Sequence, residues 1–244
     1  MAITKIGLKA LKKFVLPAQK ATSTNHKRAL SLGYPDLLVR EEDMEDLFGE
    51  EISLALDYRA DSAQIAKWHN VDLGGIADSF SFFSALGFEL DVVDITQARG
   101  REIILDMNHA SPPDMHERYD LVIDGGTLEH CFNVAQAMEN IATFVNHHGH
   151  ILQSNPLSSF NHGFYNFNPT FYYDFYSKNG FEIEYFKGLV NPIVDTKEFD
   201  LPAHGRFQGV PNDASVILVA KRKTIVEIAW PIQSKYVSNP FLRG

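Results

Sequence analysis

The chain has 244 residues, of which 45% are hydrophobic and 22% are charged, a composition typical of one α/β domain with a full apolar core. Its formal net charge of -9 argues against general binding to nucleic acid, which needs a basic surface, and fits a small or neutral substrate better. A single cysteine, Cys131, excludes a disulfide framework, and the absence of a spanning-length apolar run or signal-peptide pattern predicts a cytoplasmic protein without integral membrane contact.

The first predicted element is a basic amphipathic helix over residues 3–16, ended by Pro17, in which four lysines are interspersed with apolar residues. We favour a helix that docks on the domain or covers an active site. The alternative is a surface for an anionic membrane, for an acidic partner or for self-association into a homo-oligomer. Residues 1–24 are thus expected to be a helix and a Thr/Ser-rich linker, and residues 25–244 a single domain.

From residue 28 onward, predicted strands and helices alternate. The strands are expected over 28–32, 52–58, 88–95, 102–105, 119–123 and 149–154, and the helices over 41–48, 77–86 and 134–145. This order predicts a doubly wound, mostly parallel, Rossmann-like α/β sheet with right-handed crossovers. A helix over 169–179 and strands over 181–186 and 214–221 follow, and the two strands are expected to form an antiparallel hairpin at the sheet edge.

The most informative segment is residues 119–130, Tyr-Asp-Leu-Val-Ile-Asp-Gly-Gly-Thr-Leu-Glu-His. An apolar strand runs directly into Asp124, a glycine pair and an acid next to a histidine. Ligands of open α/β sheets bind outside the carboxyl ends of the parallel strands. Polar groups concentrated at this strand end therefore predict a binding or catalytic site.

This segment, extended to residue 133, is followed by residues 149–156 (Gly-His-Ile-Leu-Gln-Ser-Asn-Pro) and 161–169 (Asn-His-Gly-Phe-Tyr-Asn-Phe-Asn-Pro). Together they resemble class I S-adenosylmethionine-dependent methyltransferases, particularly a bacterial group with Gly-Thr-Leu-Glu-His and His-Gly-Phe-Tyr segments. The resemblance covers about residues 28–186. It implies a methyltransferase-like sheet, S-adenosyl-L-methionine as cofactor, and a small-molecule or sugar intermediate as methyl acceptor in a biosynthetic pathway. The alternative is a protein of this fold with different chemistry or with only a binding role.

Three carboxylates at strand ends are candidate cofactor contacts. Asp94 is placed to accept hydrogen bonds from both ribose hydroxyls of an adenosine group, although a solvated strand-end acid would look the same. The resemblance suggests that Asp106 accepts from the adenine amino group and that Met107 covers the ring, whereas Asp106 could instead cap a turn. Asp124 would face the methionine moiety or the substrate, with an ordinary Asp-Gly turn as the alternative.

Two glycine segments compete for the loop that approaches the cofactor. Gly33 matches the position implied by the resemblance, while Gly74, in Asp72-Leu-Gly-Gly75, has the better spacing from Asp94 for a compact βαβ unit. Gly33 is slightly preferred. Neither segment has the several closely spaced glycines that this family usually carries.

His162 is the best candidate for a general base, followed by His130 and Glu129, because an imidazole can take a proton from a methyl acceptor near neutral pH. A loop histidine bonded to the backbone, or a capping role for His130, would leave the same sequence pattern. Candidate substrate contacts are Asn155, Tyr165 and Phe167. The histidines near Gly149 do not form a spaced zinc-ligand set, so we predict no metal.

Overall fold

The computed structural model describes residues 1–20, 27–191, 193 and 195–237. Its elements run in this order: β1 (Ala2–Thr4), α1 (Lys5–Ala10), the π-helix η1 (Leu11–Val15), α2 (Leu16–Lys20), β2 (Lys27–Leu32), β3 (Asp36–Leu38), α3 (Glu41–Phe48), α4 (Glu50–Leu54), α5 (Ser62–Trp68), α6 (Ser79–Ala85), β4 (Phe88–Asp94), β5 (Ile103–Ile104), the 3₁₀ helix η2 (Pro113–Met115), β6 (Tyr119–Asp124), the 3₁₀ helix η3 (Leu128–His130), α7 (Val134–Phe144), β7 (Val145–Pro156), α8 (Pro169–Lys178), β8 (Phe181–Val190), β9 (Lys197–Asp200), β10 (Ser215–Arg222) and α9 (Ser234–Val237).

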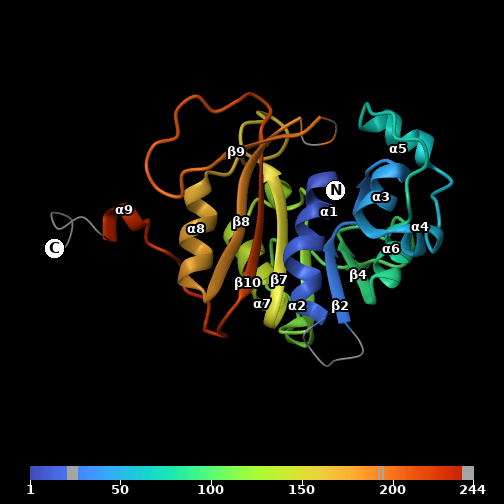
Figure 1. Cartoon of the computed structure of the whole chain (residues 1–244). Helices are drawn as coiled ribbons and strands as arrows, with labels where there is room; N and C mark the ends of the chain where they lie inside the picture. Colours follow the sequence, from blue (N-terminus) through green and yellow to red (C-terminus); the bar gives the residue numbers. More distant parts are fainter. Residues whose placement is uncertain (21–26, 192, 194, 238–244) are drawn as a thin grey trace.

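Eight strands form one sheet in the order β5-β4-β2-β6-β7-β10-β8-β9 (Figure 1). The pairs from β5 to β7 are parallel, whereas β10 is antiparallel to both β7 and β8, and β9 is antiparallel to β8. The doubly wound, mostly parallel sheet with an antiparallel C-terminal edge is therefore confirmed. Because β2, β4 and β6 are parallel neighbours, their carboxyl ends meet at one edge, which is where a ligand site is expected.

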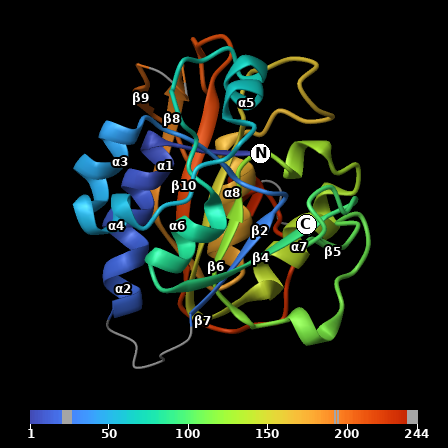
Figure 2. The ribbon, with the colours of Figure 1, turned by 90° about the vertical axis from the view of Figure 1, so that its right-hand side faces the viewer.

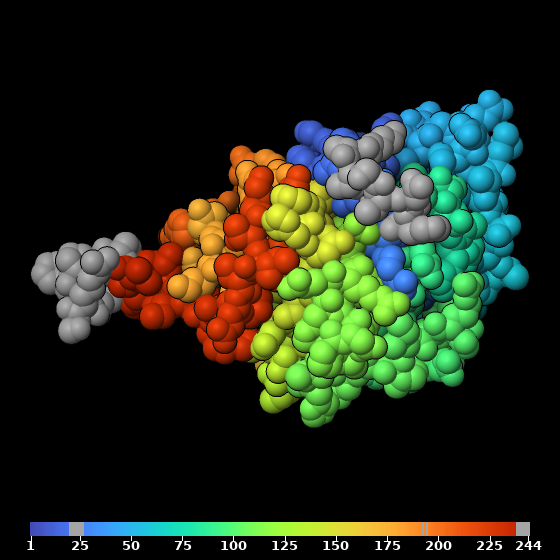
Figure 3. Space-filling view, turned by 90° about the horizontal axis from the view of Figure 1, so that it is seen from below, coloured from blue at the N-terminus to red at the C-terminus, as the bar shows by residue number. Residues whose placement is uncertain are grey.

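Helices cover both faces of this sheet (Figure 2). One apolar cluster joins the N-terminal helix and α6 to residues such as Leu121, Ile123 and Leu152. A second cluster joins α7 and α8 to alternate residues of the same strands, such as Val122 and Ile151. Since successive side chains of a strand point to opposite faces, each central strand contributes to both clusters, and β6 and β10 contain uninterrupted apolar runs. In Figure 3, α3 to α5 lie at one end of the molecule and the segment carrying α9 extends from the other.

Most predicted elements are present, but the strand expected over 52–58 is wrong. The chain there forms α4, and a single bridge between Tyr58 and Ala77 follows it. The apolar residues of this segment do not form one buried face, because Leu56 is buried whereas Leu54 is 79% exposed and Tyr58 is 40% exposed. Both edges of β4 and of β2 are already paired with other strands, so the segment cannot insert beside either of them. The elements β1, β3, α5, β9 and α9 were not predicted.

The N-terminal helix continues past Pro17 to Lys20, so the predicted end at Pro17 is wrong. The π-turn η1 precedes the proline, and the amide of Leu16 donates to the carbonyl of Leu11 across five residues. Proline has no N–H to donate and normally breaks the regular ladder, and this wider turn accommodates it. The predicted linker before Asn25 lies outside the described residues.

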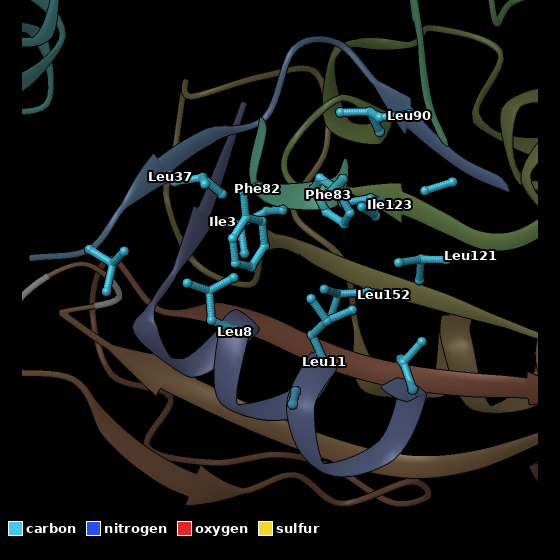
Figure 4. Packing of buried hydrophobic residues seen from close by; sticks show 14 of the residues in the cluster. Ile3, Leu8, Leu11, Leu37, Phe82, Phe83, Leu90, Leu121, Ile123 and Leu152 are labelled. Atoms are coloured by element: carbon cyan, nitrogen blue, oxygen red, sulfur yellow. The ribbon is translucent and has the colours of Figure 1, made fainter. Parts of the chain in front are cut away.

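The apolar side of this helix packs on the sheet. Leu8 and Leu11 are fully buried and lie on the side that faces Phe82 and Leu152 (Figure 4). Lys9, Lys12 and Lys13 remain exposed on the opposite side. None of the described helices is long and apolar enough to cross a membrane.

A buried histidine in β7 makes stability depend on pH. His150 is 0% exposed, and neither ring nitrogen has a hydrogen-bond partner, although Nε2 lies 3.4 Å from Oε2 of Glu184. Burial, followed by the charge of its cross-strand neighbour Lys221, lowers the pKa of His150 to about 4. The unfolded chain therefore binds a proton near pH 6.5 that the folded chain rejects until about pH 4. Above pH 6.5 this histidine therefore does not reduce the free energy of unfolding. Below pH 6.5 the free energy of unfolding decreases as the pH falls towards 4.

We expect the substitution His150→Leu to remove about 2 kcal/mol of the acid-induced loss between pH 7 and pH 4.5, which is less than the full shift because pH 4.5 lies above the folded-state pKa of His150. Urea unfolding at pH 7 and pH 4.5 measures the difference. His109→Leu, at a side chain that is 81% exposed, is the control and should keep the wild-type dependence. If the free energy of unfolding falls by the same amount between pH 7 and pH 4.5 in the wild type and in both variants, His150 is not the cause of the pH dependence.

Candidate functional site

A cavity of about 390 Å³ opens at the carboxyl ends of β2, β4 and β6. Its lining combines predicted cofactor contacts with the first residue of the chain. The lining residues are Met1, Leu32, Gly33, Val93, Asp94, Ile95, Leu105, Asp106, Met107, Asn108, Gly126, Thr127, His130 and Cys131. The volume lies in the range of small-ligand and cofactor sites, roughly 300 to 1,000 Å³.

The two predicted adenosine-binding carboxylates meet at this cavity. Asp94 ends β4, and its Oδ1 accepts from the amide of Thr96 at 3.2 Å. Asp106 follows β5, and its Oδ1 accepts from the backbone amide and the side-chain amide of Asn108 at 2.9 and 2.8 Å. These hydrogen bonds lower the pKa of Asp106 and favour its ionised form. The buried side chain of Met107 forms an apolar part of the wall between them.

The two candidate glycines lie in different places. Gly33 directly follows β2 with a φ of +77°, donates its amide to the carbonyl of Val93 at 2.7 Å, and lines the cavity. A Cβ added there would lie 2.7 Å from Cγ of Met1. Gly74 also has a positive φ, +71°, but it sits in the loop between α5 and α6 and does not line the cavity. The structure thus places Gly33, and not Gly74, beside Asp94.

Asp124 is turned away from the cavity. It is 0% exposed, and its Oδ1 accepts from the backbone amides of the turn that follows β6, including Thr127 at 2.8 Å. Its Oδ2 accepts from side-chain amides of Gln153 at 3.0 Å and Asn155 at 2.8 Å. The prediction that Asp124 faces the cofactor is therefore replaced by a positioning role, since both oxygens hold the Gly-Gly-Thr turn and β7 together.

The same turn delivers Glu129 to a buried position. Glu129 lies in η3, is 1% exposed, and its Oε2 accepts from Nδ2 of Asn155 at 3.1 Å. One amide group thus bridges two buried carboxylates. Burial, and then the charge of Asp124, raises the pKa of Glu129 to about 7.

Both candidate histidines lie against this carboxylate. Oε1 of Glu129 is 3.5 Å from Nε2 of His162 and 4.0 Å from Nε2 of His130, and the two ring centroids are 5.3 Å apart. The loop after β7 reaches Glu129 because Phe164 donates its amide to the carbonyl of Glu129 at 2.8 Å. Gly163 permits this approach, since a Cβ there would lie 2.7 Å from that carbonyl oxygen. The structure therefore brings His162, His130 and Glu129 into one cluster, and His130 also lines the cavity.

The predicted substrate contacts are only partly accessible. Asn155 is 2% exposed and, besides bridging the carboxylates, its Oδ1 accepts from the hydroxyl of Tyr172 at 2.8 Å. Phe167 is 4% exposed and belongs to the apolar cluster under α8. Tyr165 is half-buried and donates its hydroxyl to the carbonyl of Phe132 at 2.8 Å. Of the three, Tyr165 has the surface to meet a ligand directly.

Nine residues of the cavity wall were not predicted as site residues, among them Met1, Thr127 and Cys131. The hydroxyl of Thr127 lies 2.7 Å from the carbonyl of Leu32 and 2.9 Å from Sδ of Met1. Thr127 and Cys131 flank the Leu-Glu-His segment, and this position next to the strand end was the signal for both. Met1 arrives through the parallel pairing of β1 with β3, which no local pattern indicates.

The sequence matches no model of a known protein family and no curated protein. Among solved structures, the chain is similar to the DszA carbon methyltransferase, with 10% identity and a TM-score of 0.47 over 90% of this chain and 53% of that one. The chain thus spans about half the length of that protein. It is also similar to the MccD protein, with 11% identity and a TM-score of 0.44 over 89% and 96% of the two chains. A putative methyltransferase from Bacillus halodurans shows 10% identity and a TM-score of 0.40 over 86% and 99%.

At these identities and TM-scores, the assignment of a function depends on the residues of the cavity and not on the likeness. Several of these similar solved structures are named methyltransferases. The chain itself has the doubly wound, Rossmann-like sheet with an antiparallel C-terminal edge that was predicted as the methyltransferase-like pattern.

Proposed function

We propose that the protein is an S-adenosyl-L-methionine-dependent methyltransferase that acts on a small-molecule or sugar intermediate. The observation that carries this proposal is the convergence of Gly33, Asp94 and Asp106 on one cavity at the carboxyl ends of parallel strands. Carboxylates at such strand ends suit the hydroxyl and amino groups of a nucleoside. The acidic net charge of -9 favours a small acceptor over nucleic acid.

The cavity wall fits the parts of this cofactor. Asp94 would accept hydrogen bonds from the ribose hydroxyls, because its Oδ2 is not used by the turn at Thr96. Asp106 would accept from the adenine amino group, and the apolar side chain of Met107 would cover the ring. The backbone at Gly33, which carries no Cβ, would leave room for the methionine part.

The cofactor supplies an activated methyl group on a sulfonium, so the protein has to align the acceptor with it and remove a proton where the acceptor is protonated. We assign the acceptor to the side of the cavity where His130 and His162 are exposed, with side-chain exposures of 51% and 55%. His162 would accept the proton, and buried Glu129 would orient its ring. Tyr165 would contact the acceptor next to them.

Calorimetric titration with S-adenosylmethionine and with S-adenosylhomocysteine tests the proposal. We expect one site per chain and binding of both compounds, with the demethylated product at least as tight as the cofactor. Absence of heat with either compound at millimolar concentration would reject the cofactor assignment and leave a protein of this fold with another role.

The two glycines provide a matched pair of variants. Gly33→Ala and Gly74→Ala should each destabilise the fold by about 1 to 2 kcal/mol, because both residues have a positive φ that a Cβ disfavours. Only Gly33→Ala should also weaken S-adenosylhomocysteine binding, by about tenfold, since its Cβ would enter the cavity wall while that of Gly74 meets nothing within 4 Å. Calorimetry on both variants measures this. Weaker binding in Gly74→Ala alone would move the cofactor loop to Asp72–Gly75.

The substitution His162→Ala should lower turnover by about tenfold while leaving the dissociation constant of S-adenosylhomocysteine unchanged. The expected loss is moderate because His130 and Glu129 remain within 4.0 Å of each other and can partly replace the missing imidazole. Initial rates and product binding are measured on the same preparation. Equal losses in turnover and in product binding would reject a role for His162 toward the acceptor.

A further inference from the structure

Glu129, His130 and His162 form a cluster whose chemistry goes beyond proton transfer. Each offers one ligand atom, a carboxylate oxygen or an imidazole nitrogen, and these atoms all lie within 4.8 Å of one another. Two histidines and one carboxylate are a recurring ligand set for catalytic divalent metals. We propose that this cluster binds one divalent transition-metal ion beside the cofactor cavity.

The distances are close to those that a metal ion requires. Ligand atoms at 2.0 to 2.2 Å from an ion are separated from each other by about 3 to 3.6 Å. Oε1 of Glu129 and Nε2 of His162 are already 3.5 Å apart, and Nε2 of His130 is 4.0 Å from the same oxygen. The His130 side chain is half-exposed, so a small rotation would bring its nitrogen into the set.

The carboxylate ligand is held by its surroundings. Oε2 of Glu129 accepts from Asn155, whose own oxygen accepts from the Tyr172 hydroxyl, so Oε1 is turned toward the histidines. Such outer hydrogen bonds fix the orientation of metal ligands. Gly163 and the bond from Phe164 to the Glu129 carbonyl fix the loop that carries His162. The protein therefore holds two of the three ligands before any ion arrives.

Charge gives an independent reason to expect a cation. Two carboxylates, Asp124 and Glu129, are 0% and 1% exposed and share the amide of Asn155. Among the described residues, neither forms an ion pair with a lysine or an arginine. Buried acidic groups are costly unless a positive charge or donors compensate them. Asp124 has five donors for its two oxygens, whereas among the described residues the ionisable side chains within 4.0 Å of Oε1 of Glu129 are the two imidazoles.

The nitrogen ligands point to ions such as Zn²⁺, Mn²⁺, Fe²⁺ or Co²⁺ and not to Mg²⁺ or Ca²⁺, which prefer oxygen. Three protein ligands leave coordination positions open on the exposed side of the two histidines. A hydroxyl of the acceptor bound there would release its proton to solvent at a lower pH than in water, and the resulting alkoxide would take the methyl group as the demethylated cofactor leaves. This role rests on the proposed function and names the acceptor class as a hydroxyl compound. It revises the assignment of His162 given above: with the ion bound, His162 holds the metal, and only the metal-free protein would use it as the direct base.

The test uses the full chain without a histidine tag, treated with a chelator and dialysed. Titration with ZnCl₂ in the calorimeter and with CoCl₂ in the visible spectrometer should give one site per chain and the absorption bands of protein-bound Co²⁺. His162→Ala and Glu129→Gln should each weaken metal binding by more than tenfold, as expected for the loss of a ligand. The double variant His147→Ala/His148→Ala, which removes an adjacent exposed histidine pair outside the cluster, should bind like wild type.

Failure to bind either metal, or wild-type binding by His162→Ala, would overturn the metal site. Loss of binding only in the His147/His148 variant would also overturn it, because the ion would then belong to that pair. Thermal unfolding shows whether the Glu129→Gln protein is folded. If it is not, metal binding by the variant at the exposed His162 tests the site alone. Parallel titration with S-adenosylhomocysteine separates the two proposals: metal binding without product binding rejects only the cofactor assignment, and product binding without metal rejects only the metal site.

Discussion

Replacing Asp94 by alanine should weaken binding of S-adenosylmethionine and S-adenosylhomocysteine by about ten- to a hundredfold, with little change in the stability of the free protein. The carboxylate ends β4 at the cavity, and among the residues that the structure describes its Oδ1 accepts only from Thr96 of the following turn. Its second oxygen, Oδ2, is therefore available to accept hydrogen bonds from a ligand. Losing two charged hydrogen bonds to the ribose hydroxyls accounts for the expected range, and calorimetry measures it.

Two further variants make this result specific. Asp94→Asn keeps the size of the side chain and one acceptor oxygen, so its binding should fall between those of wild type and alanine. Asp72→Ala removes an exposed acid beside the rejected glycine segment and should bind like wild type. Wild-type binding by Asp94→Ala would show that the nucleoside is held elsewhere and would remove the main support for the proposed function.

The convergence of Asp94 and Asp106 was predictable because it follows from topology, whereas Gly33 was preferred on the resemblance and against the spacing, which favoured Gly74. Apolar runs identified the parallel strands, and the carboxyl ends of neighbouring parallel strands must meet at one edge of the sheet. The helix over Glu41–Phe48 was also predicted with its observed bounds, since acidic residues in the first turn and apolar residues at helical spacing mark it locally.

The residues that could not be placed depend on contacts between distant segments. A short apolar run such as 52–58 is ambiguous between helix and strand until the edges of the sheet are known. The orientation of Asp124 depends on β7, where Gln153 and Asn155 occupy alternate positions of one face and Gln153 is the cross-strand partner of Asp124. Two buried amides at i and i+2 opposite a strand-end acid were a readable signal for an inward-facing carboxylate.

The buried hydrogen-bond network beneath the site should make Asn155 one of the most sensitive positions of the fold. Asn155→Leu keeps the volume of the side chain but removes the amide that donates to Asp124 and Glu129 at 2.8 and 3.1 Å. It also leaves the hydroxyl of buried Tyr172 without its acceptor. Each lost hydrogen bond to a buried carboxylate costs about 1.5 to 3 kcal/mol, so we expect the free energy of unfolding to fall by about 3 to 5 kcal/mol at pH 7.

Urea unfolding of Asn155→Leu and of Asn168→Leu, a control at an exposed asparagine whose side chain does not cap α8, measures this effect. The control should change stability by less than about 0.5 kcal/mol. A loss below 1 kcal/mol in Asn155→Leu would mean that neither carboxylate depends on the shared amide. In that case Asn155 would be free to contact substrate, as its sequence position first suggested. A large loss instead assigns it to holding Glu129 in place, because a carboxylate that is buried without its donor would turn away from the histidines.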